Sequence, residues 1–218
     1  MILCDIGNSF LHFYYHGKVW RESKDNLSVK DSKEIIIFIS VNEELTKTLL
    51  YSHASCFDLT PFLSLDTNYK GLGVDRIAAC KAIKDGVIVD AGSAITIDVM
   101  QQGIHLGGYI LPGIAQYKKV LGLIPILDCE MNLGVSVDTF PQNTRDAVSF
   151  GMLKSILLMI ENTSKSKKIY FTGGDGKFLS RFFVNCIMMN YWFLKVCKKL
   201  LQRRLLQRVL FYDKGCLA

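Results

Sequence analysis

Two similar turns recur in this chain, 85 residues apart, and each closes a short apolar strand. The first is Asp5-Ile6-Gly7-Asn8-Ser9, and the second is Asp90-Ala91-Gly92-Ser93-Ala94. Further strand candidates and then helical segments follow each turn, so the chain has the pattern of an internal repeat. The repeat predicts two α/β lobes with a cleft between them, residues 1–85 and residues 86–218.

Hydrophobic periodicity predicts the elements of each lobe. In the first, strands are expected at 2–7, 10–15, 19–20, 35–41 and 55–59, and helices at 43–51 and 76–84. In the second, strands are expected at 86–91, 94–100, 105–110 and 168–171, and helices at 115–121 and 144–162. The apolar face predicted for the longest helix holds Val148, Met152, Ile156, Met159 and Ile160.

The first turn combines a carboxylate, a glycine and two small polar residues at the end of a strand. Gly7 lets the backbone approach a ligand, and Asn8 and Ser9 offer donors for phosphate oxygens. Asp5 can hold Mg²⁺ through water, because that ion favours one or two carboxylates together with phosphate oxygens. The alternative is a plain β-turn, in which these residues only suit the dihedral angles.

The second turn favours the nucleotide interpretation, because two carboxylate–glycine turns at equivalent points of a repeat would face each other across the cleft. A third turn, Thr172-Gly173-Gly174-Asp175, would let an adenosine lie against the backbone. Three such turns in this order are typical of actin and the sugar kinases. They predict a duplicated ribonuclease-H-like α/β fold with a mixed β-sheet in each lobe. A Walker A loop at 173–177 is rejected, because Phe178 stands where that motif needs Ser or Thr.

The segment Gly71-Leu72-Gly73-Val74-Asp75-Arg76 sets an acid beside a guanidinium at the start of a predicted helix. Asp75 is the candidate general base for an attacking hydroxyl, and Arg76 would orient the substrate or neutralise developing charge. The alternative is a helix N-cap by Asp75, with Arg76 in a surface ion pair.

Six segments in order give the chain its resemblance to the type III pantothenate kinases. They are residues 5–9, 73–76, 90–96, 107–113, 143–146 and 172–175. The resemblance implies ATP-dependent phosphorylation of pantothenate to 4′-phosphopantothenate, the first step of coenzyme A biosynthesis. Two regions depart from it: residues 112–143 are compact, and the tail 184–218 does not look like the closing strand and helix of the family.

The same resemblance implies a role for each site residue. ATP would contact Asp5, Ile6, Gly7, Asn8, Ser9, Phe10, Leu11, His12 and Ser93. Pantothenate would contact Tyr69, Gly73, Val74, Asp75, Arg76 and Thr144, with Asp75 as the catalytic base. Asp90 would bind a monovalent cation, K⁺ or NH₄⁺, in addition to the Mg²⁺ that accompanies ATP. The resemblance also implies a homodimer, with the helix at 144–162 at or near the interface.

The formal net charge of +6 invites a nucleic-acid interpretation, but the six basic residues within 184–212 account for all of it. We therefore expect no nucleic-acid partner for the body of the chain. No apolar run approaches the ~20 residues of a membrane span, and no signal-peptide pattern opens the sequence. The seven cysteines are scattered, as expected of thiols in a reducing compartment, so we expect a cytoplasmic protein without a membrane partner.

Two other functions stay open at this point. One is an enzyme of the same fold that either phosphorylates another small hydroxyl substrate or hydrolyses a phosphoanhydride. The other is a nucleotide-binding regulator that has lost catalysis and uses the basic amphipathic pattern at 195–210 to contact DNA. The presence of Asp5, Asp75 and Asp90 together argues against lost catalysis.

Overall fold

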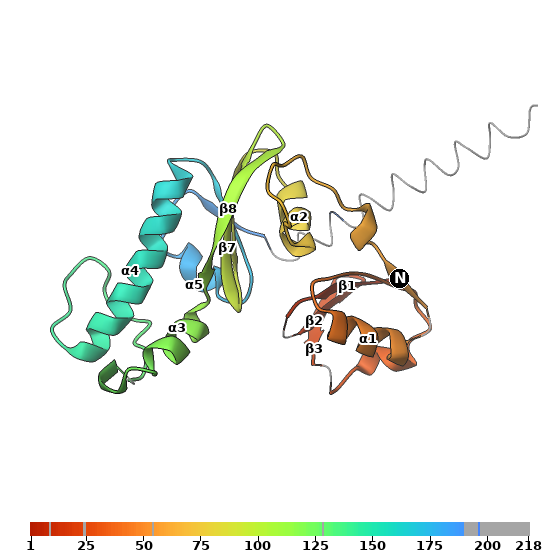
Figure 1. The fold of residues 1–218 in the computed structure, drawn as a ribbon, viewed down its shortest axis with the longest axis horizontal. Helices are drawn as coiled ribbons and strands as arrows, with labels where there is room; N and C mark the ends of the chain where they lie inside the picture. The colour runs from red at the N-terminus through yellow and green to blue at the C-terminus, as the bar shows by residue number, and fades with distance from the viewer. Residues whose placement is uncertain (9, 24, 54, 128, 190–195, 197–218) are drawn as a thin grey trace, which may run out of the picture. The chain divides into compact units, whose positions relative to one another are not determined.

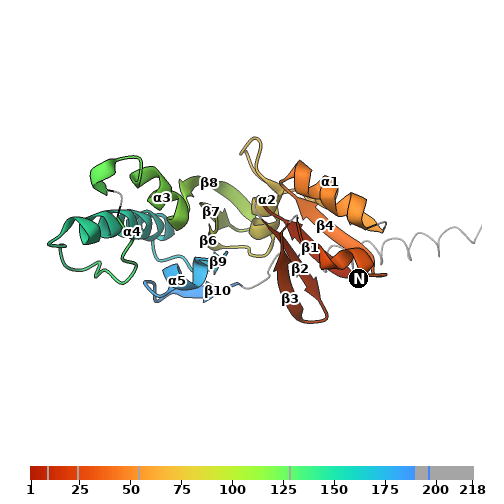
Figure 2. The same ribbon diagram turned by 90° about the horizontal axis from the view of Figure 1, so that it is seen from below.

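The computed structural model describes residues 1–8, 10–23, 25–53, 55–127, 129–189 and 196. The chain divides into two compact units. Among the described residues, the first holds 1–65, 70–82 and 196, and the second holds 66–69 and 83–189. Each unit is built on one five-stranded sheet (Figures 1 and 2).

The first sheet has the strand order β3-β2-β1-β4-β5. Its strands are β1 (Ile2–Ile6), β2 (Leu11–Tyr15), β3 (Lys18–Glu22), β4 (Ile36–Ser40) and β5 (Cys56–Asp58). Strands β1, β2 and β3 are antiparallel, whereas β4 runs parallel to β1, and β5 runs parallel to β4. The helices of this unit are the short 3₁₀ helices η1 (Ser28–Asp31) and η2 (Thr60–Phe62), and α1 (Glu43–Ser52) and α2 (Val74–Lys81).

The core of the first unit lies between this sheet and α1. Strand β4 is buried over its first four residues, as expected for an isoleucine-rich strand covered on both faces. From α1, Leu45 and Leu49 are one turn apart and join the same core as the side chains of β1 and β2. The helix begins where the side chain of Asn42 accepts the N–H of Leu45 at 3.0 Å.

The second sheet has the order β10-β9-β6-β7-β8. Its strands are β6 (Gly86–Ala91), β7 (Ala94–Gln101), β8 (Ile104–Pro112), β9 (Ile169–Thr172) and β10 (Cys186–Met188). The helices are α3 (Ile114–Leu121), the 3₁₀ helix η3 (Pro125–Leu127), α4 (Thr144–Ser164) and α5 (Gly176–Ser180). Figure 1 shows α4 as the long helix alongside this sheet, where it contacts β6 and β7.

The two sheets have the same topology, which confirms the duplicated fold. In each, three antiparallel strands come first, the fourth strand runs parallel to the first, and the fifth runs parallel to the fourth. The expectation that the chain after Phe183 lacks a closing strand is wrong for 186–188. Strand β10 pairs there with β9, Ile187 opposite Tyr170. Three residues are too few to show a period, so only the pairing reveals this strand.

Helix α4 buries one apolar stripe against the second sheet. The stripe consists of Met152, Leu153, Ile156, Leu157 and Ile160. The prediction that Met159 shares this face is wrong, because its side chain is 43% exposed. At 3.6 residues per turn, positions 153 and 157 continue the stripe and position 159 falls outside it. Within the described residues, no helix has both the length and the apolar character to cross a membrane.

Candidate functional site

The first predicted turn lies in the hairpin between β1 and β2 of the first unit. The N–H of Gly7 donates to the carbonyl oxygen of Phe10 at 3.1 Å. Asn8 and Phe10 are exposed, whereas the side chains of Ile6 and Leu11 are fully buried. Those two buried residues can therefore offer a ligand only their backbone groups.

The cap of α1 holds this turn in place. The side-chain amide of Asn42 donates through Nδ2 to the carbonyl oxygen of Asn8 at 3.2 Å, while its Oδ1 caps the helix. One side chain thus joins the turn to the start of α1. Asn42 was not among the residues predicted from the sequence. Ser9, which was, lies outside the described residues.

A row of polar side chains crosses the first sheet beside the turn. Asp5 pairs with His12 across β1 and β2, and His12 pairs with Arg21 across β2 and β3, so the three side chains project from one face. Burial of the imidazole lowers the pKa of His12, and the positive charge of Arg21 lowers it further. The Arg21 guanidinium lies 4.7 Å from the centre of the Phe10 ring. This face of the sheet therefore carries a carboxylate at the turn and a cation two strands away.

In the second unit, three backbone segments converge at the end of β6. The N–H of Gly113 donates to the carbonyl oxygen of Ser93 at 3.2 Å. The N–H of Asp175 donates to the carbonyl oxygen of Ala91 at 2.9 Å. The second and third predicted turns, about 80 residues apart in sequence, therefore lie together, because β6 and β9 are parallel neighbours and end at the same edge of the sheet.

Two glycines are required by these close approaches. A Cβ on Gly113 would lie 2.3 Å from the carbonyl oxygen of Gly92, and a Cβ on Gly173 would lie 2.5 Å from Oδ1 of Asp90. Gly173 also has a φ of +83°, which favours glycine. In contrast, a Cβ on Gly92 or Gly7 would make only ordinary contacts, at 3.8 and 3.5 Å. Protein packing does not explain these last two glycines, whereas a ligand lying against the backbone would.

Helix α3 begins directly after this contact. Gly113 is its N-cap residue, and the carbonyl oxygen of Gly113 accepts the N–H of Tyr117 at 3.0 Å. The amino end of α3 therefore lies at the Ser93 turn, where the helix dipole favours an anion. Ser93 is exposed and Asp90 is half-buried. The pKa of Asp175 is raised by burial.

The acid–guanidinium segment opens helix α2 in the first unit. The N-cap is Gly73, not Asp75, so the N-cap alternative for Asp75 is wrong. The backbone N–H of Arg76 donates to Oδ1 of Asp75 at 2.8 Å, and a Cβ on Gly73 would lie 2.5 Å from that oxygen. Glycine at 73 thus gives the carboxylate room to fold back over the helix end. Arg76 is only 6% exposed, so the surface ion pair is wrong too, and Val74 is buried beside it.

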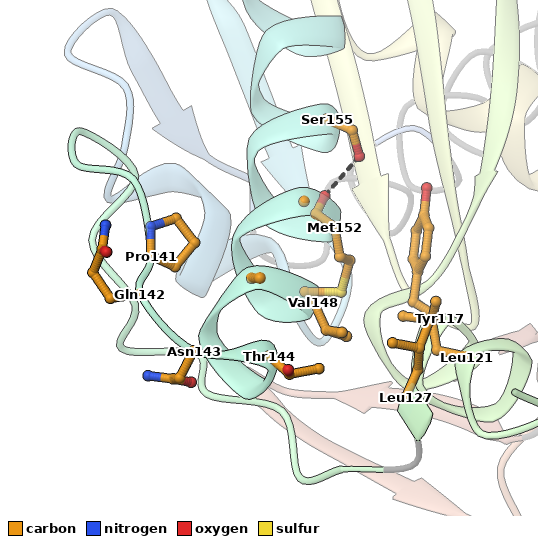
Figure 3. Close-up of a pocket in the computed structure, with 12 residues that line it drawn as sticks. Tyr117, Leu121, Leu127, Pro141, Gln142, Asn143, Thr144, Val148, Met152 and Ser155 are labelled. Atoms are coloured by element: carbon orange, nitrogen blue, oxygen red, sulfur yellow. Dashed lines mark hydrogen bonds between the residues drawn. The ribbon is translucent and has the colours of Figure 1, made fainter. Parts of the chain in front are cut away.

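Thr144 is the first residue of α4 and lines a groove of about 740 Å³ in the second unit. Figure 3 shows α4 forming one wall of this groove, with α3 and η3 forming the other. The lining includes Tyr117, Leu121, Leu127, Thr144, Val148 and Met152. The groove and the Ser93 turn share helix α3. Tyr69, the other residue of this unit that is predicted to contact pantothenate, is 37% exposed.

The start of α4 is held by a cluster of amide groups. Asn143 caps the helix by accepting the N–H of Asp146 at 2.9 Å. The side-chain amides of Asn132 and Asn143 donate to the two carboxylate oxygens of Asp146, at 2.6 and 2.7 Å. These two hydrogen bonds lower the pKa of Asp146. They fix the backbone on which Thr144 sits.

Comparison with known proteins identifies the family. The model of the family described as type III pantothenate kinase matches residues 24–166. A type III pantothenate kinase from Helicobacter hepaticus is 53% identical over 206 residues, which cover 94% of this chain and 100% of the relative. The chain belongs to the type III pantothenate kinase family. The family predicted from the six sequence segments is thereby confirmed.

Other type III pantothenate kinases are similarly close. The one from Wolinella succinogenes is 54% identical over 191 residues, 87% of this chain and 91% of its own. Among solved structures, a conserved protein from Campylobacter jejuni, described as a Baf family transcriptional activator, has a TM-score of 0.82 at 45% identity and covers 94% of this chain and 98% of its own. A Sinorhizobium meliloti protein described as a 2-dehydro-3-deoxygalactonokinase shares the fold alone, with a TM-score of 0.58 at 7% identity over 93% of this chain and 96% of its own.

The structure also shows residues that support the predicted site residues and that were not themselves predicted from the sequence. Asn42 and Gly113 hold the two turns, and Asp98 and His105 form a buried pair beneath the Tyr69 segment. A signal for the pair existed in the sequence. Asp98 is the only charged residue of its strand, and a histidine follows on the next strand, so a partner for a buried charge was available nearby.

Proposed function

We propose that this chain phosphorylates pantothenate on its 4′ hydroxyl with ATP, giving 4′-phosphopantothenate and ADP, the first step of coenzyme A biosynthesis. The observation that carries the proposal is the 53% identity to a type III pantothenate kinase over the whole length of that relative. The site residues implied by the sequence stand at turns, helix starts and a groove, which are places suited to phosphates and to a small polar substrate.

ATP would be held by the two duplicated turns. The exposed backbone and side chains within residues 5–12 would contact it in the first unit, and Ser93 would contact it in the second. The glycines at 7 and 92 support this role, because space beside them is not filled by protein packing. The amino end of α3 beside Ser93 adds a positive partial charge for a phosphate oxygen.

Asp75 would act as the general base. Its carboxylate takes the proton of the 4′ hydroxyl, the alkoxide oxygen bonds to the γ-phosphorus of ATP, and the bond from that phosphorus to the β–γ bridging oxygen breaks to release ADP. The backbone N–H of Arg76 orients the carboxylate at the start of α2. Pantothenate would contact Tyr69, Gly73, Val74, Arg76 and Thr144.

The donor set fits the cations that accompany ATP. Asp5 and Asp90 supply hard carboxylate oxygens at their turns, and these suit Mg²⁺ or an alkali cation. Asp5 would hold Mg²⁺ through water, and Asp90 would bind K⁺ or NH₄⁺. Such cations, when bound, neutralise phosphate charge, which lowers its repulsion with the aspartates.

A homodimer in the cytoplasm is part of the proposal. Large apolar side chains close in sequence to residues that line the groove of Thr144 are mostly exposed in the single chain: Leu123 (81%), Ile126 (80%) and Phe140 (84%). A second copy of the chain would cover them, as the family resemblance implies. Sedimentation equilibrium of the protein should give twice the mass of the chain, and Ile126→Asp should lower it toward the single-chain mass. We expect no nucleic-acid or membrane partner.

The direct test is pantothenate-dependent ADP release with K⁺, NH₄⁺ or Na⁺ in the buffer. Activity with K⁺ or NH₄⁺ and much less with Na⁺ is expected. If ADP forms only with another alcohol from a panel of small hydroxyl substrates, the fold holds and the substrate assignment fails.

Asp75→Asn tests the base itself. The amide keeps the shape of the carboxylate but takes up no proton, so kcat should fall by about 10²-fold or more with little change in ATP binding. Quenching of intrinsic fluorescence on titration with ATP checks the binding. Near-normal turnover would remove Asp75 as the base.

A DNA-binding regulator is the second candidate, favoured by the description of the Campylobacter jejuni structure as a transcriptional activator. The basic pattern at 195–210, on which that reading depends, lies outside the described residues apart from Val196. Binding to duplex DNA that weakens steeply with salt and vanishes when residues 184–218 are deleted would support it.

A further inference from the structure

A histidine and an aspartate form a buried pair at the edge of the second sheet. Nε2 of His105 on β8 lies 2.8 Å from Oδ1 of Asp98 on β7, and both side chains are almost completely shielded from solvent, at 0% and 1% exposure. The pair lies beside the register shift that separates Val99 from Met100. The proposed reaction makes no use of either residue.

His105 also forms hydrogen bonds with the segment at residues 66–69. Its Nδ1 lies 2.7 Å from Oγ1 of Thr67, and that same Oγ1 accepts the backbone N–H of Tyr69 at 3.0 Å. The backbone is tied as well, because the N–H of His105 donates to the carbonyl oxygen of Asp66 at 3.0 Å. The rings of Tyr69 and His105 lie 6.1 Å apart. All of these residues belong to the second unit.

The hydrogen bonds have one consistent direction when the histidine is neutral. A carboxylate only accepts, so Nε2 of His105 carries the proton and donates it to Asp98. Nδ1 is then an acceptor and receives the hydroxyl proton of Thr67, whose oxygen in turn accepts the Tyr69 N–H. Three hydrogen bonds therefore connect the Tyr69 backbone to the Asp98 carboxylate on β7. Each partner sets the orientation of the next.

We propose that Asp98, His105 and Thr67 form a positioning chain that holds the Tyr69 segment in its substrate-binding conformation. The inference rests on the proposed function, in which Tyr69 contacts pantothenate. A buried Asp–His pair is often only a structural feature of a core. Here its outer end is the peptide group of a residue that keeps 37% of its surface exposed. Residues 73–76, which are also proposed to contact pantothenate, follow Tyr69 closely in the sequence.

Thr67→Val tests the proposal with the least disturbance, because valine keeps the shape and removes the hydroxyl that links His105 to Tyr69. The KM for pantothenate should rise about tenfold, with kcat and the KM for ATP within about twofold of the unmodified chain. Thr67→Ser keeps the hydroxyl and should restore the pantothenate KM. Thr163→Val is the matched control: it removes a hydroxyl that lies 2.6 Å from the Tyr109 hydroxyl in the same unit, without a link to Tyr69.

Amide hydrogen exchange gives a second readout that does not depend on activity. The Tyr69 amide should exchange faster in Thr67→Val than in Thr67→Ser, and equal rates would overturn the anchor whatever the substrate is. An unchanged pantothenate KM in Thr67→Val, or an equal rise in both Michaelis constants, would overturn the positioning role alone. If the unmodified protein released no ADP with pantothenate, the proposed function would be overturned. The positioning role of Asp98, His105 and Thr67 would then fail with it.

Discussion

The two duplicated turns share a residue pattern, yet the protein surrounds them differently. The Asp5 turn is a hairpin of its own, and two hydrogen bonds join it to the segment before α1. The N–H of Val41 donates to the carbonyl oxygen of Ile6 at 3.1 Å, and the Asn42 side chain donates to the carbonyl oxygen of Asn8 at 3.2 Å. The Asp90 turn is enclosed by two further backbone segments, at Gly113 and Gly173, each closer than a side chain would allow. Duplication has therefore kept the chemistry of the turn while the support has diverged. A polar side chain takes part in the support of the first turn, whereas the second turn depends on the absence of side chains.

The largest expected effect comes from filling the space at the second turn. Gly113→Ala should lower the free energy of unfolding by about 3 kcal/mol, because its Cβ would meet a backbone oxygen 2.3 Å away. Its φ of −67° suits alanine, so the clash is the cause and backbone strain is not. Urea denaturation followed by circular dichroism measures the change. Stability equal to that of the unmodified chain would mean that the second turn is no more tightly packed than the first.

The carboxylates of Asp5 and Asp90 are proposed to bind different cations, so their variants should differ. Asp5→Asn and Asp90→Asn should each lower kcat/KM by about 10- to 100-fold, because each removes a charge that would hold a cation beside the phosphates. Only Asp90→Asn should also abolish the preference for K⁺ over Na⁺. Initial rates in the two salts measure this. A preference lost equally in both variants would contradict the assignment of the monovalent cation to the second turn.

A smaller effect is expected where the protein leaves room. Gly7→Ala and Gly92→Ala bring no clash with the protein, so the free energy of unfolding should stay within about 1 kcal/mol of the unmodified value. The KM for ATP should nevertheless rise about tenfold, since a methyl group would occupy space reserved for the ligand. If both variants bind ATP normally, these glycines serve the turn conformation alone.

Local pattern and family resemblance predicted most of this molecule from its sequence. The strands at both duplicated turns, the long helix and the order of the segments followed from periodicity and turn chemistry, and the shared topology of the two sheets confirms the repeat. Strand β10 was missed because it has three residues and depends on pairing with β9. Met159 was misassigned because the width of the buried stripe on α4 is set by the sheet, which the helix sequence does not contain.

Candidate site residues could be named from the sequence where a motif is contiguous, and their support could not be named where it comes from elsewhere in the chain. Asp75 and Arg76 are adjacent, so the acid–guanidinium pair could be recognised in the sequence, but the burial of Arg76 could not. The support of Ser93 by Gly113 and the link from Thr67 to His105 join residues 20 and 38 positions apart. Contacts of that kind follow from strand pairing, and no local pattern encodes them.

The smallest expected effect compares two helix caps, one in each compact unit. Asn42 caps α1 and holds the Asn8 turn, whereas Asn143 caps α4 beside Thr144. Either alanine variant should cost about 1 kcal/mol of stability through the lost cap. Asn42→Ala should raise the KM for ATP about threefold, since one hydrogen bond to a turn that keeps its own hairpin is lost. Asn143→Ala should leave that KM unchanged and raise the KM for pantothenate instead.

The carboxyl of Asp146 provides an internal control for this pair. Asn143 donates one of the two hydrogen bonds that lower the pKa of Asp146, so in Asn143→Ala this pKa should rise toward its ordinary value. Asn42→Ala should leave the pKa of Asp146 unchanged, because Asn42 belongs to the other compact unit. Carboxyl chemical shifts in an NMR titration measure both. If Asn42→Ala changed the pantothenate KM as much as the ATP KM, the caps would act through the stability of the whole fold, and not separately on the Asn8 turn and the start of α4.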